Sequence, residues 1–407
     1  MAASRRWRNL GTAAGAATAT LFALYDLYQW VAAYTADRFH NDFTFYVAAA
    51  RIGLAHGWSS IYDLTLQQVE LDAMGSGIKI AELARYISPP PVAWLALPFT
   101  ALPYPVAYWT WCALLLVALG FTWGLAAPEV GRARVIFIAA AVGWLPVVYG
   151  LQLAQPGLLV AFGVAGSYAL LRANRPLWAG VALGALVLKP QLAFLVPVAL
   201  LAARHDRAFL GSVLALGLLA AASAIALGPG GLSAYEARLN FAAGVPVNRE
   251  LTLAYFLGAG VVTRAAQVAM AVWSLALAYR TRRRGVEWLY ICALVGGMLA
   301  TPYVHLDDLA MLGLAAWLLL RLSVPAWSWL YVLGLVLAIE GEPLWGPAPV
   351  IAFELGALVL LSVAALKHDD SDSEQHRSER EHDARLDRDG QHVPSERQPE
   401  AVDVRGS

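Results

Sequence analysis

Long apolar runs dominate the pattern of hydrophobic and polar positions along this chain. Most of them have about 15–25 residues, and an apolar helix of about 20 residues crosses the roughly 30 Å hydrocarbon core of a bilayer. Only helices and closed barrels satisfy their backbone polar groups in lipid. The pattern therefore predicts an all-α polytopic membrane protein, a bundle of about 12 transmembrane helices. The predicted crossings are residues 10–34, 89–102, 105–127, 135–151, 156–172, 176–202, 208–227, 263–280, 286–302, 308–321, 326–340 and 348–366.

Arginines in two places predict how the bundle is oriented. Arg5, Arg6 and Arg8 precede the first apolar run, and the loop 280–284 is the most basic loop in the body of the chain. Positive residues stay on the cytoplasmic side of a membrane, so both places should lie inside. Twelve crossings satisfy this requirement, with residues 1–9 as a cytoplasmic N-terminus and the C-terminus also inside. We predict a multi-pass protein of the cell membrane, plasma or inner.

Three features of this path leave alternatives open. The path places four arginines outside, against the charge rule: Arg132, Arg134, Arg172 and Arg175. The run 176–202 contains Lys189-Pro190, which could divide it into two half helices. The first run could be a cleaved signal peptide, but its length and its Asp26 favour a retained helix.

Composition supports the membrane class and separates a tail from it. The chain is 59% hydrophobic and 14% charged, whereas soluble domains have roughly 45–50% apolar and about 25% charged residues. It shows no basic face or motif for nucleic acid, and Cys112 and Cys292 suggest no disulfide framework. Residues 367–407 carry seven Lys and Arg against twelve Asp and Glu. This composition predicts a disordered acidic cytoplasmic tail after a transmembrane domain of residues 10–366.

Two sizeable segments, residues 36–88 and 228–263, lie outside the membrane on this path. The first alternates apolar and polar residues at helical spacing, as at Phe43, Val47 and Leu54. Such stretches are too polar to cross a bilayer and are typical of helices that lie in the interface. We therefore predict interfacial helices in the first extracytoplasmic loop, 36–88.

Two stretches at the outer face carry residues suited to chemistry. Asp42 begins the first interfacial helix among aromatic residues. It is either a capping or first-turn residue or a general base whose pKa is raised by burial. His305, Asp307 and Asp308 follow another crossing. They form either a polar loop with Asp307 as a helix cap, or a site in which His305 donates to a phosphate or holds a hydroxyl. Their spacing is not typical of metal ligands, so no metal site is predicted and metal dependence stays open.

Further polar residues interrupt apolar stretches or lie at the outer interface. Lys189, followed by Pro190 and Gln191, either extends to the interface or meets an anionic group in a cavity. Gln155 marks another break, less specifically. Four outer arginines are either solvated or hold a lipid phosphate: Arg85, Arg238, Arg249 and Arg264.

The order of several short motifs resembles a known family. The motifs are Asp42–Ala50, Gly57 with Ile61-Tyr62-Asp63, Tyr86–Pro98, Gln155, Leu188–Gln191 and Ala300–Asp308. Over about residues 10–365 the chain resembles glycosyltransferase family 87, which includes the polyprenyl-phosphate-mannose-dependent mannosyltransferases that build phosphatidylinositol mannosides. The resemblance implies a GT-C fold, a multi-spanning bundle whose large first outside loop holds the catalytic acid.

The resemblance also implies roles for single residues. Asp42 matches the catalytic carboxylate, and His305 matches a catalytic-site histidine. The candidates for binding the donor phosphate are Lys189, Arg85 and Arg249. The supporting residues are Tyr46, Tyr62, Asp63, Gln155, Gln191, Tyr303, Asp307 and Asp308.

The expected function is therefore an integral membrane hexosyl- or mannosyltransferase. It would move a sugar from a polyprenyl-phosphate donor to a lipid or glycan acceptor on the extracytoplasmic side, with inversion and with no cofactor. The chain has no phosphate-binding Gly-rich loop for a nucleotide, and a lipid-linked co-substrate needs none. The alternatives are a transporter or lipid flippase and a surface polysaccharide polymerase or ligase. The latter would need a large central outside loop, for which 228–263 is a modest candidate.

Overall fold

The structure is a computed structural model that describes residues 2–81, 85–128, 134–322, 325 and 327–366. Helix makes up 81% of it, and the described residues include no strand. The helices are α1 (Ala2–Ala36), α2 (Asp42–His56), α3 (Leu64–Ala73), α4 (Pro90–Ala96), α5 (Tyr104–Ala126), α6 (Arg134–Val142), α7 (Leu145–Gln152), α8 (Gly157–Arg172), α9 (Pro176–Ala182), α10 (Leu195–Ala202), α11 (Asp206–Gly244), α12 (Ala254–Leu257), α13 (Val261–Arg280), α14 (Val286–Ala300), α15 (Ala310–Arg321), α16 (Trp327–Glu340), α17 (Glu342–Trp345) and a last helix, Ala348–Leu366. The 3₁₀ segments are η1 (Trp58–Ser60), η2 (Leu97–Ala101), η4 (Leu183–Leu188), η5 (Pro190–Leu192), η6 (Pro246–Arg249) and η7 (Leu306–Leu309).

The described residues up to Val359 form one compact unit, and those after it belong to a second unit. In the second unit the described residues 360–366 are helical. The predicted tail, 367–407, lies outside the described residues. All packing described below belongs to the first unit.

Four helices are long and apolar enough to cross a membrane: α5, α11, α13 and Ala348–Leu366. A fifth crossing results if α6 and α7, which are bent by 49° at a short break, count as one. Helix α1 is not among them, because the Thr, Gly and Tyr residues and Asp26 of the predicted run 10–34 lower its mean hydropathy. By length and composition alone, the described helices therefore number fewer than the twelve predicted crossings.

Besides the bent pair α6 and α7 in the run 135–151, two further predicted crossings are not single helices. The run 89–102 forms the short helix α4 and the 3₁₀ segment η2, and its Val92, Ala93 and Ala96 are fully buried. The run 176–202 divides at Lys189, whose backbone is not helical (φ −155°, ψ 75°). Pro190 causes this division because proline disfavours helical geometry in the preceding residue and lacks an N–H group.

The predicted outside segment 228–263 is largely helical. Helix α11 continues through it to Gly244, with a kink at Gly228 (φ 59°, ψ −178°) that is followed by Pro229. A positive φ is accessible mainly to glycine, so the Gly-Pro pair turns the helix without ending it. A kink and a helix end have the same Gly-Pro signature, so the sequence did not show that the helix continues; the position of this segment outside the membrane stays a prediction. After the kink, Gly231 lies against Ser59 of η1.

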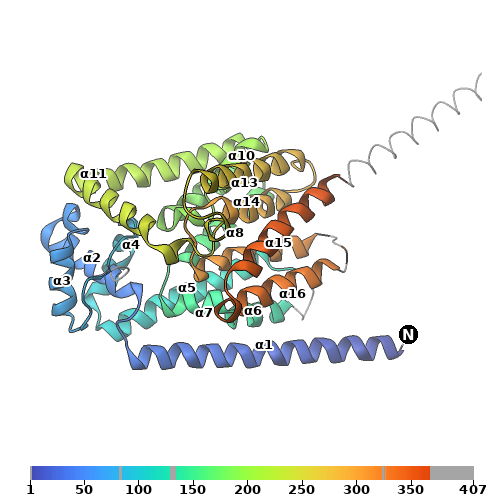
Figure 1. Ribbon diagram of the computed structural model, residues 1–407, viewed down its shortest axis with the longest axis horizontal. Helices are drawn as coiled ribbons and strands as arrows, with labels where there is room; N and C mark the ends of the chain where they lie inside the picture. Colours follow the sequence, from blue (N-terminus) through green and yellow to red (C-terminus); the bar gives the residue numbers. More distant parts are fainter. Residues whose placement is uncertain (1, 82–84, 129–133, 323–324, 326, 367–407) are drawn as a thin grey trace, which may run out of the picture. The chain divides into compact units, whose positions relative to one another are not determined.

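The helices of the first unit run between two ends, which we name by their contents. The cavity end holds the starts of α2, α8 and α13, the turn at Lys189, and residues 301–309. There the N–H of Asp42 donates to the carbonyl of Leu153 at 3.0 Å, and the Gln267 amide donates to the carbonyl of Thr301 at 2.9 Å. Figure 1 shows α1 running from the N-terminus to the neighbourhood of α2 and α3 at this end.

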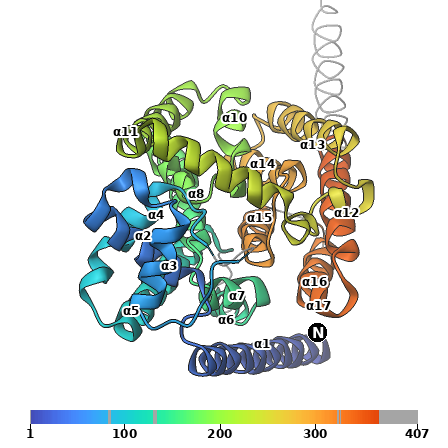
Figure 2. The same cartoon turned by 60° about the vertical axis from the view of Figure 1, so that its left-hand side comes forward.

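The arginine end holds the C-terminal ends of α8, α13 and α15 and the starts of α6, α9, α11 and α14. Tyr168 of α8 donates to Glu287 of α14 at 2.7 Å, and Arg321 of α15 donates to the carbonyl of Ala127 at 3.0 Å. Helices α9 and α11 start together there and run side by side, with Leu177 against Gly211. Figure 2 shows the same bundle turned, with α2, α3 and α4 grouped on one side.

Candidate active site

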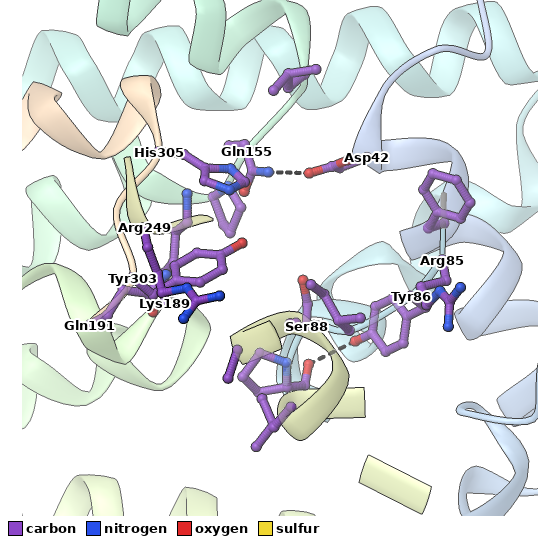
Figure 3. Close-up of a pocket in the computed structure, with 18 of the residues that line it drawn as sticks. Asp42, Arg85, Tyr86, Ser88, Gln155, Lys189, Gln191, Arg249, Tyr303 and His305 are labelled. Atoms are coloured by element: carbon purple, nitrogen blue, oxygen red, sulfur yellow. Dashed lines mark hydrogen bonds between the residues drawn. The ribbon is translucent and has the colours of Figure 1, made fainter. Parts of the chain in front are cut away.

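A cavity of about 940 Å³ opens at the cavity end. Its lining comes from distant parts of the chain: the start of α2, the stretch before α4, the α7–α8 connection, the turn at Lys189, the second half of α11, the start of α13 and residues 301–305. Breaks between helices therefore form much of the wall, and each break exposes polar side chains to the same space. Figure 3 shows the labelled residues around it.

Asp42 is the first residue of α2 and is half-buried at the cavity wall. It does not cap this helix, because Asn41 does so by accepting the N–H of Thr44 at 3.3 Å. The Asp42 carboxylate instead accepts a hydrogen bond from the side-chain amide of Gln155. The amide oxygen of Gln155 in turn accepts the hydroxyl of Tyr46 at 3.3 Å. The amide is thus oriented from behind and presents its N–H groups to Asp42.

The surroundings of Asp42 suit proton transfer near neutral pH. Burial, the largest cause, and the negative charge of Asp307 raise the pKa of Asp42 from 3.8 to about 7, against the opposing effects of Lys189 and the Gln155 hydrogen bond. A carboxyl group with such a pKa exists in both forms at neutral pH, which is the condition for an efficient general base.

Lys189 is held by two acids from a distant part of the chain. Its ammonium group pairs with Asp307 at 2.5 Å and also with Asp308, and all three side chains are buried. Asp308 additionally accepts the backbone N–H of His305 at 2.9 Å. The ammonium charge is therefore already balanced inside the protein, whereas the sequence left it to reach the interface or to meet an anionic group in a cavity, and the resemblance made it a candidate for the donor phosphate.

His305 lies at the cavity wall next to this triad. Its ring stacks on Tyr303 with centroids 4.8 Å apart, and its Nε2 lies 2.6 Å from Oδ1 of Asn248. Burial lowers the pKa of His305 below 6.5, Asp307 opposes this, and Lys189 adds to it. Asn248 was not predicted, because it is a single asparagine in a short polar stretch that no motif marks.

Three arginines line the cavity: Arg85, Arg249 and Arg264. The guanidinium of Arg85 lies 4.0 Å from the ring centre of Phe241. Arg249 donates to the carbonyl of Gly244 at 3.0 Å. In Figure 3, Arg85 lies toward the side of Asp42, and Arg249 lies toward Lys189 and Tyr303.

A model of glycosyltransferase family 87 matches residues 86–302, more than half of the chain. The chain belongs to glycosyltransferase family 87. With its membrane-capable helices it is a membrane glycosyltransferase. No curated protein and no solved structure matches the chain. The matched range includes Gln155, Lys189 and Arg249, whereas Asp42 and His305 lie outside it.

Not every residue expected in the site of this family 87 glycosyltransferase reaches the cavity. Tyr46, Gln155, Gln191 and Tyr303 line it. Asp307 and Asp308 lie behind the lining and hold Lys189.

Tyr62 and Asp63 have structural contacts instead and are not among the lining residues. Tyr62 stacks between Tyr86 and Tyr235. The exposed Asp63 caps α3. Among the described residues, no group of three or more His, Cys, Asp or Glu side chains could hold a metal ion.

Proposed function

We propose that this family 87 glycosyltransferase moves a hexose, with mannose the first candidate, from a polyprenyl-phosphate donor to a hydroxyl of a lipid or glycan acceptor. The observation that carries the proposal is the Asp42 carboxylate, oriented by Gln155 at the wall of a large cavity. Ligand pockets have volumes of about 300–1,000 Å³, and the cavity volume of about 940 Å³ is near the upper limit. Such a volume suits two sugars better than one.

The proposed reaction is a single displacement with inversion at the anomeric carbon. Asp42 takes the proton of the acceptor hydroxyl while the acceptor oxygen forms its bond to that carbon. The bond between the anomeric carbon and the phosphate oxygen breaks, and its electrons leave with the polyprenyl phosphate. The products are the glycosylated acceptor, the polyprenyl phosphate and a protonated Asp42, which returns its proton to water.

Arginine is the best candidate to receive the departing phosphate. Arg249 lies across the view of Figure 3 from Asp42, as a displacement requires of base and leaving group. Arg264 lies in the first turn of α13, where helix N–H groups also favour an anion. Guanidinium groups bind phosphate in a bidentate manner. Lys189, already paired with two acids, contributes to the electrostatics of the site, and Arg85 is the remaining candidate from the sequence.

The donor lipid has an apolar wall available next to these arginines. Leu239, Ala242, Ala243 and Ala254 of α11 and α12 line the cavity there. Each buried methylene of a lipid chain contributes about 0.8 kcal/mol of membrane affinity. The donor therefore needs few polar contacts with the protein beyond its phosphate and sugar.

We further propose a revised path of twelve crossings. The run 89–102 packs on α2 and does not cross, while 176–188 and 190–202 count as two separate passes that meet at Lys189. The total stays at twelve because the two changes compensate. Interfacial helices remain part of this proposal as α2 and α3 in the first outside segment.

The revised path supports an extracytoplasmic active site in the cell membrane. It places the arginine end inside, in agreement with the charge rule. The arginines at that end are Arg134, Arg172, Arg175, Arg204, Arg207, Arg280, Arg282, Arg283, Arg284 and Arg321. Arg132, which the first path also placed outside against the charge rule, is not among the described residues. The cavity end is then outside.

Cysteine labelling of intact cells tests this orientation. Both natural cysteines are buried, so the wild-type chain provides the blank. A membrane-impermeant maleimide should label Lys79→Cys on intact cells and Arg175→Cys only after lysis. Labelling of Arg175→Cys from outside would restore the first path, in which Arg175 was outside, and would remove the support for the revised one.

The catalytic proposal is tested by Asp42→Asn in liposomes with polyprenyl-phosphate sugars. Loss of the general base should lower transfer by about 10²–10⁴-fold, while donor binding stays unchanged. Asp72→Asn is the matched control, since Asp72 is an exposed acid of the same outside segment. Full activity of Asp42→Asn would remove the assignment. If the wild-type protein moves a lipid across the vesicle membrane and transfers no sugar, the protein is a transporter or flippase and the proposed function is wrong.

A further inference from the structure

Asn248 is fully buried in η6 and connects two distant parts of the chain. Its side-chain Nδ2 donates to the carbonyl of Ala242 at 2.7 Å. Its backbone carbonyl accepts the N–H of Val304 at 3.2 Å. Its Oδ1 lies 2.6 Å from Nε2 of His305. Asn248 therefore holds both the backbone and the ring of the 304–305 stretch, without itself lining the cavity.

The hydrogen bonds of Asn248 determine where the proton of His305 resides. The Ala242 carbonyl can only accept, so the NH₂ group of Asn248 faces it and the amide oxygen faces the ring. An amide oxygen can only accept as well. Nε2 of His305 must then be the donor and carry a proton. A neutral ring in this form can accept a hydrogen bond only at Nδ1.

The charges around His305 keep the ring neutral near pH 7. Asp307 favours the charged ring, whereas burial and Lys189 oppose it, and burial is the largest effect. Asp308 accepts the backbone N–H of His305 and pairs with Lys189. Tyr303 stacks on the ring, and Arg249, the residue after Asn248, lines the same cavity.

We propose that Asn248 is a positioning residue that holds His305 neutral and protonated at Nε2. At the cavity wall the ring then has an acceptor only at Nδ1 and brings no positive charge to the lipid phosphate. That this neutral ring serves a sugar hydroxyl rests on the proposed function. Of the two roles expected from the sequence, the proposal keeps the holding of a hydroxyl and sets aside donation to a phosphate.

The protonation state is measured directly by ¹⁵N NMR on histidine-labelled full-length protein in detergent micelles, with His305→Gln to assign the signals. At pH 7 the Nε2 signal should be that of a protonated nitrogen, and the Nδ1 signal that of an unprotonated one. A ring protonated at Nδ1, or at both nitrogens, overturns the proposal. The measurement needs no turnover, so its outcome is separate from any failure of the proposed function.

Asn248→Asp tests the positioning role with a side chain of the same shape. A carboxylate next to Nε2 favours the charged ring and should raise the midpoint of the His305 titration by about 1–3 pH units. Transfer at pH 7 should then fall by about tenfold as the neutral ring is depleted. Asn240→Asp, at an exposed position of α11, should leave both readings unchanged. An unmoved midpoint, or faster transfer with tighter donor binding in Asn248→Asp, overturns the proposal.

Discussion

Charged side chains are held differently at the two ends of the bundle. At the cavity end, Lys189 and Asp307 are 8% and 3% exposed and pair with each other across 118 positions of sequence. At the arginine end, charges lie at helix termini. There Arg134 donates to the carbonyls of Trp123 and Gly124, and Arg321 donates to that of Ala127.

The difference separates two uses of charge in one protein. A cation near a helix C-terminus satisfies carbonyls that lack a partner and interacts favourably with the helix dipole. It therefore stabilises the bundle without a cavity. A buried ion pair loses several kcal/mol of hydration per ion, and its attraction often only offsets that loss. The buried charges of Lys189, Asp307 and Asp308 therefore add little net stability, and in the proposed function they set the electrostatics around Asp42.

The largest expected effect is on stability, from Lys189→Met. Removal of one partner from a buried ion pair leaves uncompensated charge and costs about 3–5 kcal/mol of unfolding free energy. Both Asp307 and Asp308 lose their cation in this variant. The measurement is reversible unfolding of the purified protein in mixed micelles, followed by circular dichroism.

The matched control for Lys189 lies at the other end. Arg172 and Glu287 form a pair at 3.8 Å in which the arginine side chain is 49% exposed. Arg172→Met should cost less than about 1 kcal/mol. Equal losses in Lys189→Met and Arg172→Met would show that the two ends do not differ in how they hold charge.

A smaller effect is expected on donor affinity, from Arg249→Gln. A hydrogen bond to a charged group contributes about 1.5–3 kcal/mol, and partial exposure of Arg249 reduces this, so KM for the donor should rise roughly tenfold. kcat should change little if the contact is made equally in the ground state and the transition state. Arg175→Gln at the arginine end should leave KM within about twofold. A rise of KM in that control would place donor contacts at the wrong end.

The next prediction concerns the pH dependence of kcat/KM for sugar transfer. Asp42 must be ionised to accept a proton, and its pKa is raised to about 7. kcat/KM should therefore level off above pH 7 and fall about tenfold per unit well below it. Gln155→Leu removes a hydrogen bond that lowers this pKa, so the acid limb should move to higher pH. Glu287→Gln at the arginine end should not move it. If kcat/KM of the wild type falls only near pH 4, the carboxylate that acts as the base has the pKa of a solvated group and is not Asp42.

Hydropathy predicted the helical class, but it could not separate burial in lipid from burial in protein. The run 89–102 is as apolar as a crossing, yet Val92 and Ala93 of α4 are buried inside the protein. A run of about 10–14 residues is more often a core or re-entrant helix than a crossing. The proline after Lys189 did indicate the divided pass, because its effect on the backbone is local.

The candidate site was predictable only where a motif carried it. Asp42, Gln155 and His305 were proposed from the resemblance, and the fold brings them to one cavity. The partners of Lys189 were not predictable, because a pairing with Asp307 across 118 positions depends on tertiary packing. Asn248 had no signal at all, since its role rests on two hydrogen bonds that only the folded chain creates.

The smallest expected effect concerns Asp63. Like Asp42, this acid belongs to the segment 36–88 and lies at the start of a helix, but its helix is α3. Its carboxylate accepts the N–H groups of Thr65 and Leu66 at 2.8 and 3.0 Å and caps α3. Asp63→Ala should cost about 1 kcal/mol of unfolding free energy, as loss of a helix cap does. Transfer should stay within about twofold of wild type, since Asp63 does not line the cavity.

Asp63→Asn keeps the cap and should match wild type in both stability and transfer. Asp42→Asn should show the opposite pattern, with transfer lost and stability kept, because Asn41 caps α2 in its place. The two conservative variants therefore differ only in whether a carboxylate faces the cavity. Loss of transfer in Asp63→Asn would place Asp63 in the site, as the resemblance implied. It would also show that an exposed acid at a helix start in this segment can be catalytic and not only a helix cap.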